Sequence, residues 1–146
     1  MLTGDFTVTT TRDPERVRAY LTDFTHQADW RDDVIDSVLD SGQRGADGAV
    51  YRQQVHQGPG TATRRLHVTV RDRGDHVEWA TLDDAPVTAA GRYELATDDG
   101  GTTTVHCTTD LTFHGAGHAL RPVVSRTLRQ RMDDYARALT AQLDRL

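Results

Sequence analysis

The C-terminal sequence LRPVVSRTLRQRMDDYARALTAQLDRL, residues 120–146, indicates how the whole chain is built. Its large apolar side chains recur at spacings of 4, 4, 4, 3, 4, 4 and 3: Leu120, Val124, Leu128, Met132, Tyr135, Leu139, Leu143 and Leu146. These spacings place them on one stripe of a helix of about seven turns. Pro122 falls in the first turn, where its missing N–H costs little. We therefore expect a long amphipathic helix that needs an apolar partner.

Upstream of this helix, the pattern changes to the period of two that is typical of β-strands. Short turns rich in Gly, Asp and Pro interrupt it. Because such turns join antiparallel neighbours, whereas parallel strands need longer crossovers, we expect antiparallel pairing. The predicted strands are residues 34–39, 50–57, 61–72, 76–82, 87–96 and 102–113.

The N-terminal residues predict one more strand and one or two short helices. Residues 2–10 alternate broadly, as a strand does. Asp13 can cap a helix that has Pro14 at its first position, and a second short turn is expected around residues 28–30. The order predicts an α+β fold, in which a curved antiparallel sheet of about seven strands wraps on the C-terminal helix.

Length and composition limit the class of protein. The 146 residues suit a single domain, 1–146. The formal charge of −5 argues against a nucleic-acid partner. No apolar run approaches the length of a membrane span and no secretory signal is visible, so we expect a cytoplasmic protein without membrane insertion. All 17 basic residues are arginine, which favours a bacterial source with a GC-rich genome.

The sequence lacks the residues that several kinds of catalysis and metal binding require. Without lysine there is no Schiff-base or P-loop lysine, and the single cysteine, Cys107, forms neither an internal disulfide nor a CxxC zinc site. The sequence has no HxH, HExxH, G-x-G-x-x-G or G-x-S-x-G motif. We therefore expect no cofactor, metal or nucleotide. Cys107 is interpreted as a buried inert thiol, and His118 is the one histidine that merits substitution.

The period of two also predicts which side chains share the face that the helix covers. This set is Tyr51, Gln53, Val55, Ala62, Arg64, Leu66, Val68, Val70, Val77, Trp79, Thr81, Ala89, Gly91, Tyr93, Leu95, Val105, Cys107, Thr109, Leu111 and Phe113. Glu78, Glu94 and Asp110 fall on the opposite face, so no inward acid–base pair is evident.

Several short phrases carry a family resemblance. They are Asp13-Pro14-Glu15-Arg16-Val17, Tyr20-Leu21-Thr22-Asp23-Phe24 with Trp30 following, Gly91-Arg92-Tyr93-Glu94-Leu95 and Gly101-Thr102-Thr103-Thr104-Val105. In this order, over essentially the whole chain, the sequence resembles the START-like superfamily, also called SRPBCC, of helix-grip fold. It is most similar to the bacterial branch named for polyketide cyclases, dehydrases and lipid transport. The resemblance implies a deep cavity between sheet and helix that holds an apolar ligand, but it does not select a reaction.

Two arginines are candidate ligand anchors in such a cavity. Arg64 faces inward just after Gly58-Pro59-Gly60, which matches in position the lid loop of related hormone-binding proteins. A buried guanidinium needs an anionic or carbonyl partner. The alternatives are that Arg64 reaches out to solvent or that the strand register slips. Arg31 matches a position that carries a basic anchor in related receptors, and its alternative is an exposed loop arginine.

The expected ligand is a small apolar, oxygenated metabolite that is polyketide-like or lipid-like. The alternative is an enzyme of the cyclase/dehydrase kind, aromatase-like, with Tyr93, Arg64 and Tyr51 as candidate catalytic residues. The small side chains of Ala89 and Gly91 and the polar inward groups favour a cavity over a solid core. Oligomeric state stays open, a homodimer included. The expected ligand-binding residues are Arg31, Tyr51, Gln53, Val55, Arg64, Leu66, Trp79, Ala89, Gly91, Tyr93, Cys107, Thr109, Val124 and Leu128.

Overall fold

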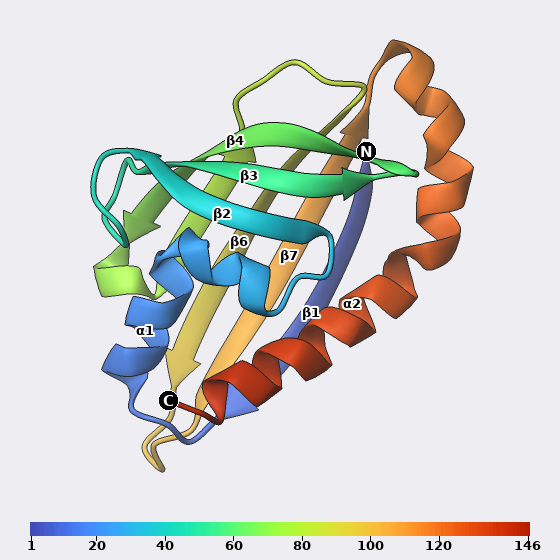
Figure 1. The fold of residues 1–146 in the computed structure, drawn as a ribbon. Coiled ribbons are helices and arrows are strands. Elements are labelled where there is room, and N and C mark those ends of the chain that lie inside the picture. Colours follow the sequence, from blue (N-terminus) through green and yellow to red (C-terminus); the bar gives the residue numbers. More distant parts are fainter.

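A computed structural model describes all residues from 1 to 146 and contains one seven-stranded sheet of order β1-β7-β6-β5-β4-β3-β2 (Figure 1). Every neighbouring pair of strands is antiparallel, as expected from the short turns. The strands are β1 (Leu2–Thr10), β2 (Val34–Ser41), β3 (Val50–Gln57), β4 (Gly60–Arg71), β5 (His76–Thr81), β6 (Val87–Thr97) and β7 (Thr103–Phe113). The predicted α+β helix-grip architecture is confirmed.

Two α-helices and three short 3₁₀-helices complete the chain: α1 (Pro14–Thr22), η1 (Phe24–Asp29), η2 (Asp72–Gly74), η3 (Gly115–Leu120) and α2 (Arg121–Leu143). The Asp13 side chain caps α1 by accepting a hydrogen bond from the Glu15 N–H at 3.0 Å. The C-terminal helix is shorter than its apolar stripe predicts, since α2 ends at Leu143 and Leu146 lies beyond it. His118 lies in η3, before α2, and is exposed. No helix is long and apolar enough to cross a membrane.

The long helix α2 lies along β1, whereas η1 packs against β2 at the other edge of the sheet (Figure 1). The side chains of Leu128 and Met132 lie over Gly4 of β1, where an added Cβ would approach them to within 3.0–3.1 Å. Near the end of α2, Arg12 donates a hydrogen bond to the carbonyl of Asp144. The apolar stripe of α2 is therefore buried from Leu128 onward.

Burial along the concave face of the sheet changes from one end to the other. Leu66, Val68, Tyr93 and Cys107 are buried. Nearer the β3–β4 and β5–β6 turns, Val55 and Phe113 are also buried, but five side chains of the same face are only half-buried: Ala62, Arg64, Val87, Ala89 and Leu111. We call this half-buried region, which lies at the end of the sheet where α2 begins (Figure 1), the open end of the concave face. Most of the remaining side chains of this face are buried.

The expectation that Gly91 leaves empty volume in mid-sheet is wrong. Trp79 lies directly opposite Gly91 across the β5–β6 pair. A Cβ built on Gly91 would lie 2.6 Å from Cε2 and Nε1 of the indole and 2.6 Å from the Thr108 carbonyl oxygen. The indole therefore fills the space that the missing side chain provides. Ala89 differs from Gly91, since it is half-buried at the open end.

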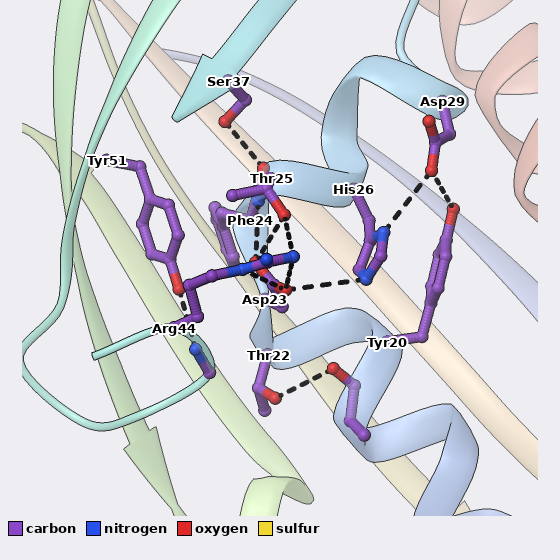
Figure 2. A network of polar contacts seen from close by, with 12 residues as sticks. Tyr20, Thr22, Asp23, Phe24, Thr25, His26, Asp29, Ser37, Arg44 and Tyr51 are labelled. Carbon is purple, nitrogen blue, oxygen red and sulfur yellow. Dashed lines mark hydrogen bonds and ion pairs between the residues drawn. The ribbon is translucent and has the colours of Figure 1, made fainter. Parts of the chain in front are cut away.

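A polar network attaches the loop between β2 and β3 to η1 (Figure 2). Arg44 donates to Asp23 from Nε at 3.0 Å and from Nη2 at 2.7 Å, and it donates to Thr25 Oγ1 at 2.9 Å. The same loop donates the Gly45 N–H to the Tyr51 hydroxyl at 2.9 Å. These contacts hold η1 in place, and η1 leads directly into the residues of the candidate site.

Candidate functional site

A cluster of charged side chains lies between the sheet and α2. Arg31 follows η1, and its backbone N–H donates to the Gln27 carbonyl at 2.9 Å. Its side chain reaches Asp33 through Nε at 3.1 Å and Nη2 at 3.4 Å. Arg64 Nη2 lies 3.6 Å from the Asp33 carboxylate. The Tyr135 hydroxyl donates to the same carboxylate at 2.9 Å. Asp33 is therefore shared by two guanidinium groups and a phenol.

Arg31 is buried at 7% exposure, so the alternative of an exposed loop arginine is wrong. Its guanidinium carbon lies 4.8 Å from the ring centre of Tyr135, 5.9 Å from that of Trp30 and 5.7 Å from that of Trp79. Aromatic faces attract cations, and the weakly hydrated guanidinium tolerates such surroundings. Trp30 packs in the core through these contacts. The rings and Asp33 together hold Arg31 in one position.

The electrostatics of the cluster are strongly coupled. Burial by itself would raise the pKa of Asp33, but the charges of Arg31 and Arg64, with hydrogen bonds from Arg31 and Tyr135, hold that pKa well below its usual range. Burial, followed by the charge of Arg31, lowers the pKa of Arg64 to about 10. All three charged groups are therefore ionised at neutral pH, and the cluster carries two positive charges against one negative charge.

A chain of amides connects Arg64 to Tyr93. Gln53 lies opposite Arg64 in the β3–β4 pair and accepts a hydrogen bond from Arg64 Nε at 3.0 Å. Gln53 Nε2 donates to Gln27 Oε1 at 2.8 Å and to Ser37 Oγ at 3.2 Å. Gln27 Nε2 then donates to the Tyr93 hydroxyl at 2.7 Å. Each buried amide of this chain is therefore paired at both its oxygen and its nitrogen.

Two buried donors have no hydrogen-bond partner: Arg64 Nη2 and Trp79 Nε1. The Arg64 side chain is 20% exposed, whereas its Nη2 atom is buried. The contact of Nη2 with Asp33 is close enough for an ion pair but too long for a hydrogen bond. Buried donors are normally paired, and each unpaired one costs about 1–3 kcal/mol. An oxygen acceptor placed against Nη2 would recover that energy.

The other predicted ligand-binding residues do not join the Arg64 cluster. The Tyr51 hydroxyl accepts the loop N–H of Gly45 and does not join the Arg64 cluster. Burial raises the pKa of the Cys107 thiol, which lies beside Tyr93 in the β6–β7 pair. Val124 is half-buried on α2, and Leu128 packs over β1. The remaining predicted residues are buried on the concave face: Val55, Leu66 and Thr109.

Sequence reasoning missed several members of the cluster. Asp33 lies in the turn before β2, where neither the strand nor the helix period assigns a direction to a side chain. Gln27 lies in η1, which is too short for a periodic signal. The helix period placed Tyr135 on the apolar stripe of α2, but it did not predict that the Tyr135 hydroxyl donates to Asp33. Among the residues that were singled out, Arg31, Gln53, Arg64 and Tyr93 come together.

Three surface hollows lie outside the concave face: on the opposite face of the sheet around Ala80 and Ala90, between α1 and the Arg44 loop, and between β1 and α2. No group of three or more His, Cys, Asp or Glu side chains is arranged to hold a metal ion. The Arg64 cluster at the open end of the concave face, with its unpaired buried donor, is therefore the candidate site.

Residues 1–144 match the family described as "Polyketide cyclase / dehydrase and lipid transport". The chain belongs to this family. The match covers nearly the full length of the chain. No curated protein matches the chain significantly in sequence.

Solved structures share the fold of this family member. An aromatase/cyclase from a Streptomyces species has a TM-score of 0.75 at 20% identity, with 99% of this chain and 94% of that chain covered. A START superfamily protein from Mycobacterium smegmatis has a TM-score of 0.74 at 12% identity, with 98% and 97% covered. Ginseng major latex-like protein 151 from Panax ginseng has a TM-score of 0.63 at 13% identity, with 97% and 98% covered. At these identities the likeness shows the fold alone.

Proposed function

We propose that this chain binds a small apolar, oxygenated metabolite at the open end of its concave face, with Arg64 as the polar anchor. The observation that carries the proposal is the buried Arg64 Nη2 atom, which has no hydrogen-bond partner. A carbonyl, enol or carboxylate oxygen is the acceptor that such a donor lacks. The family description, which includes lipid transport, is consistent with a ligand of this kind.

The surroundings of Arg64 suit the apolar part of such a ligand. Ala62 lies two residues from Arg64 on the same face of β4, and Ala89, Leu111 and Val124 add half-buried apolar surface at the open end. Large apolar side chains are also exposed on the β5–β6 loop, at the end of η3 and at the start of α2: Leu82 at 49%, Leu120 at 44% and Val123 at 59%. Binding sites for small molecules combine apolar walls with few polar groups that fix orientation. The packed centre of the sheet means that a ligand would enter from the open end.

The alternative, an enzyme of the cyclase or dehydrase kind, is favoured by one observation: the Tyr93 hydroxyl lies in the same polar network as Arg64. A phenol can donate a proton to an enolate. Asp33, however, is a poor general base, since its pKa lies well below the usual range. The Tyr51 hydroxyl accepts the Gly45 N–H outside the cluster, and the Tyr135 hydroxyl donates its proton to Asp33 within it. Binding is therefore the better supported function.

The test compares methyl naphthyl ketone with ethylnaphthalene, which has the same size but no oxygen, in NMR titrations of the backbone amides. We expect saturable shifts at Ala62 and Ala89, and the ketone to bind about tenfold more tightly, as a hydrogen bond to a charged donor predicts. Arg64→Met should remove the advantage of the ketone. Arg65→Met is the matched control, because Arg65 is the next residue and pairs with Asp83 on the exposed face.

Two results would count against the proposal: no saturable binding of either probe, or equal affinities in the wild-type protein. A single-turnover experiment with a poly-β-ketone mimic separates the alternative function from binding. Product formation that depends on Tyr93 would favour the enzyme, whereas release of the unchanged mimic would favour a binding protein. Native mass spectrometry of the protein isolated from its own organism would identify the natural ligand.

A further inference from the structure

The Arg64 cluster holds an excess of positive charge. Arg31 and Arg64 face a single carboxylate, that of Asp33. The other polar groups that contact these residues are uncharged: the amide of Gln53 and the hydroxyl of Tyr135. The nearest acidic neighbour in sequence, Asp32, is 71% exposed and pairs with Arg131 at the surface. One positive charge in this largely buried cluster is therefore without a counter-charge.

The direction of each hydrogen bond in the amide chain follows from Arg64. A guanidinium has only donors, so the group that Gln53 presents to it must be the amide oxygen. The Gln53 nitrogen then faces the Gln27 oxygen, and the Gln27 nitrogen faces the Tyr93 hydroxyl. The chain thus supplies Arg64 with one neutral acceptor. A carboxylate in the position of the Gln53 amide would have nearly the same shape and would neutralise the guanidinium.

We propose that Gln53 is the specificity-determining residue of this site, and that its neutral amide makes the site select apolar ligands with an anionic oxygen over their neutral analogues. The inference rests on the proposed function and names the ligand class more narrowly, as an apolar acid or enolate. Gln53 acts through Arg64: it holds Nε and leaves both the charge and the Nη2 donor for the ligand. Bonds between charged partners are about twice as strong as neutral ones.

The experiment compares naphthoate with methyl naphthyl ketone, which share a ring system and differ in charge. We expect the wild-type protein to bind naphthoate about tenfold or more tightly than the ketone. Gln53→Glu should abolish this preference and leave the affinity for the ketone within about threefold. Gln53→Met removes the amide without adding charge and should keep the preference. Gln54→Glu is the matched control, because Gln54 is the next residue of β3 and is exposed on the opposite face.

Gln27→Glu places the same charge at the next amide of the chain and should weaken the preference as well. If Gln53→Glu loses its cooperative thermal transition, Gln27→Glu replaces it in the comparison of naphthoate with the ketone. The inference is overturned if the wild-type protein binds both probes equally, or if Gln53→Met loses the preference as fully as Gln53→Glu does. A protein that binds the ketone without preferring naphthoate refutes only this inference, whereas one that binds neither probe refutes the proposed function.

Discussion

Replacing Asp33 by asparagine should cost much of the stability of the fold. The Asp33 carboxylate is 14% exposed and contacts Arg31, Arg64 and Tyr135. Asparagine keeps the size of the side chain and removes its charge. Arg31, whose side chain is 8% exposed, would then be a buried cation with no carboxylate beside it. The repulsion between the two guanidinium groups would also be uncompensated.

The expected magnitude follows from the burial of the pair. Removing one partner of a buried ion pair costs about 3–5 kcal/mol, because the remaining charge stays desolvated. A domain of this size has a total free energy of unfolding of about 5–15 kcal/mol. At roughly 2–4 °C per kcal/mol, the thermal midpoint should fall by about 6–20 °C. The effect is thus large enough to measure and small enough to leave a folded protein at low temperature.

Urea unfolding followed by circular dichroism measures the change, and Asp32→Asn is the control. Asp32 is the adjacent residue, is 71% exposed and lies 4.0 Å from Arg131, so its loss should cost less than about 0.5 kcal/mol. If the two variants differ from each other by less than about 1 kcal/mol, the reasoning about the cluster is refuted.

The same pair of proteins gives a pH dependence. The folded-state pKa of Asp33 is depressed below its unfolded value of about 3.9. Its contribution is therefore present in full above about pH 5 and is lost as the pH falls through about 4 toward the folded pKa. The stability difference between the wild type and Asp33→Asn should be constant near neutrality and narrow in acid. A difference that widens below about pH 4 would contradict the assigned sign.

Three further outcomes are expected. Gly91→Ala should cost about 1–3 kcal/mol in urea unfolding and shift the fluorescence of Trp79, since the new methyl meets the indole and a carbonyl. Gly60→Ala should be nearly neutral, because its new methyl meets only the Gln57 carbonyl oxygen, at an ordinary contact distance of 3.9 Å. Native Cys107 should not react with Ellman's reagent until urea unfolds the chain, because burial raises the pKa of its thiol. Arg44→Ala should lower the thermal midpoint by only a few degrees in scanning fluorimetry, since the Arg44 side chain is 58% exposed and Asp23 keeps its hydrogen bonds from Thr25.

The strand periods predicted the arrangement of the sheet with few errors. Alternation identified six strands after residue 34 and placed Gln53, Arg64 and Tyr93 on one face, because neighbouring side chains of a strand always point to opposite sides. The short turns predicted antiparallel pairing for a similarly local reason. Alternation did not predict whether a small residue leaves a cavity. At Gly91, Trp79 of the neighbouring strand fills the space that the missing side chain leaves.

The site depended on contacts between residues that are distant in the chain. Tyr135 and Asp33 are 102 residues apart, and Gln27 and Tyr93 are 66 apart. Strand alternation pointed to Arg64 and the family resemblance to Arg31, with an exposed position as the alternative for Arg31. The tertiary structure showed that they share one carboxylate, contributed by a turn without any periodic signal.

The sequence alone thus determined the order of the elements, the antiparallel sheet, the long C-terminal helix and the face on which each strand side chain lies. These properties follow from periods of two and 3.6 residues, which neighbouring residues in the chain express directly. Only the tertiary structure decided which polar groups meet, which donor stays unpaired and how much charge remains uncompensated at Arg64. Such pairings depend on distances between separate elements, and no local pattern encodes them.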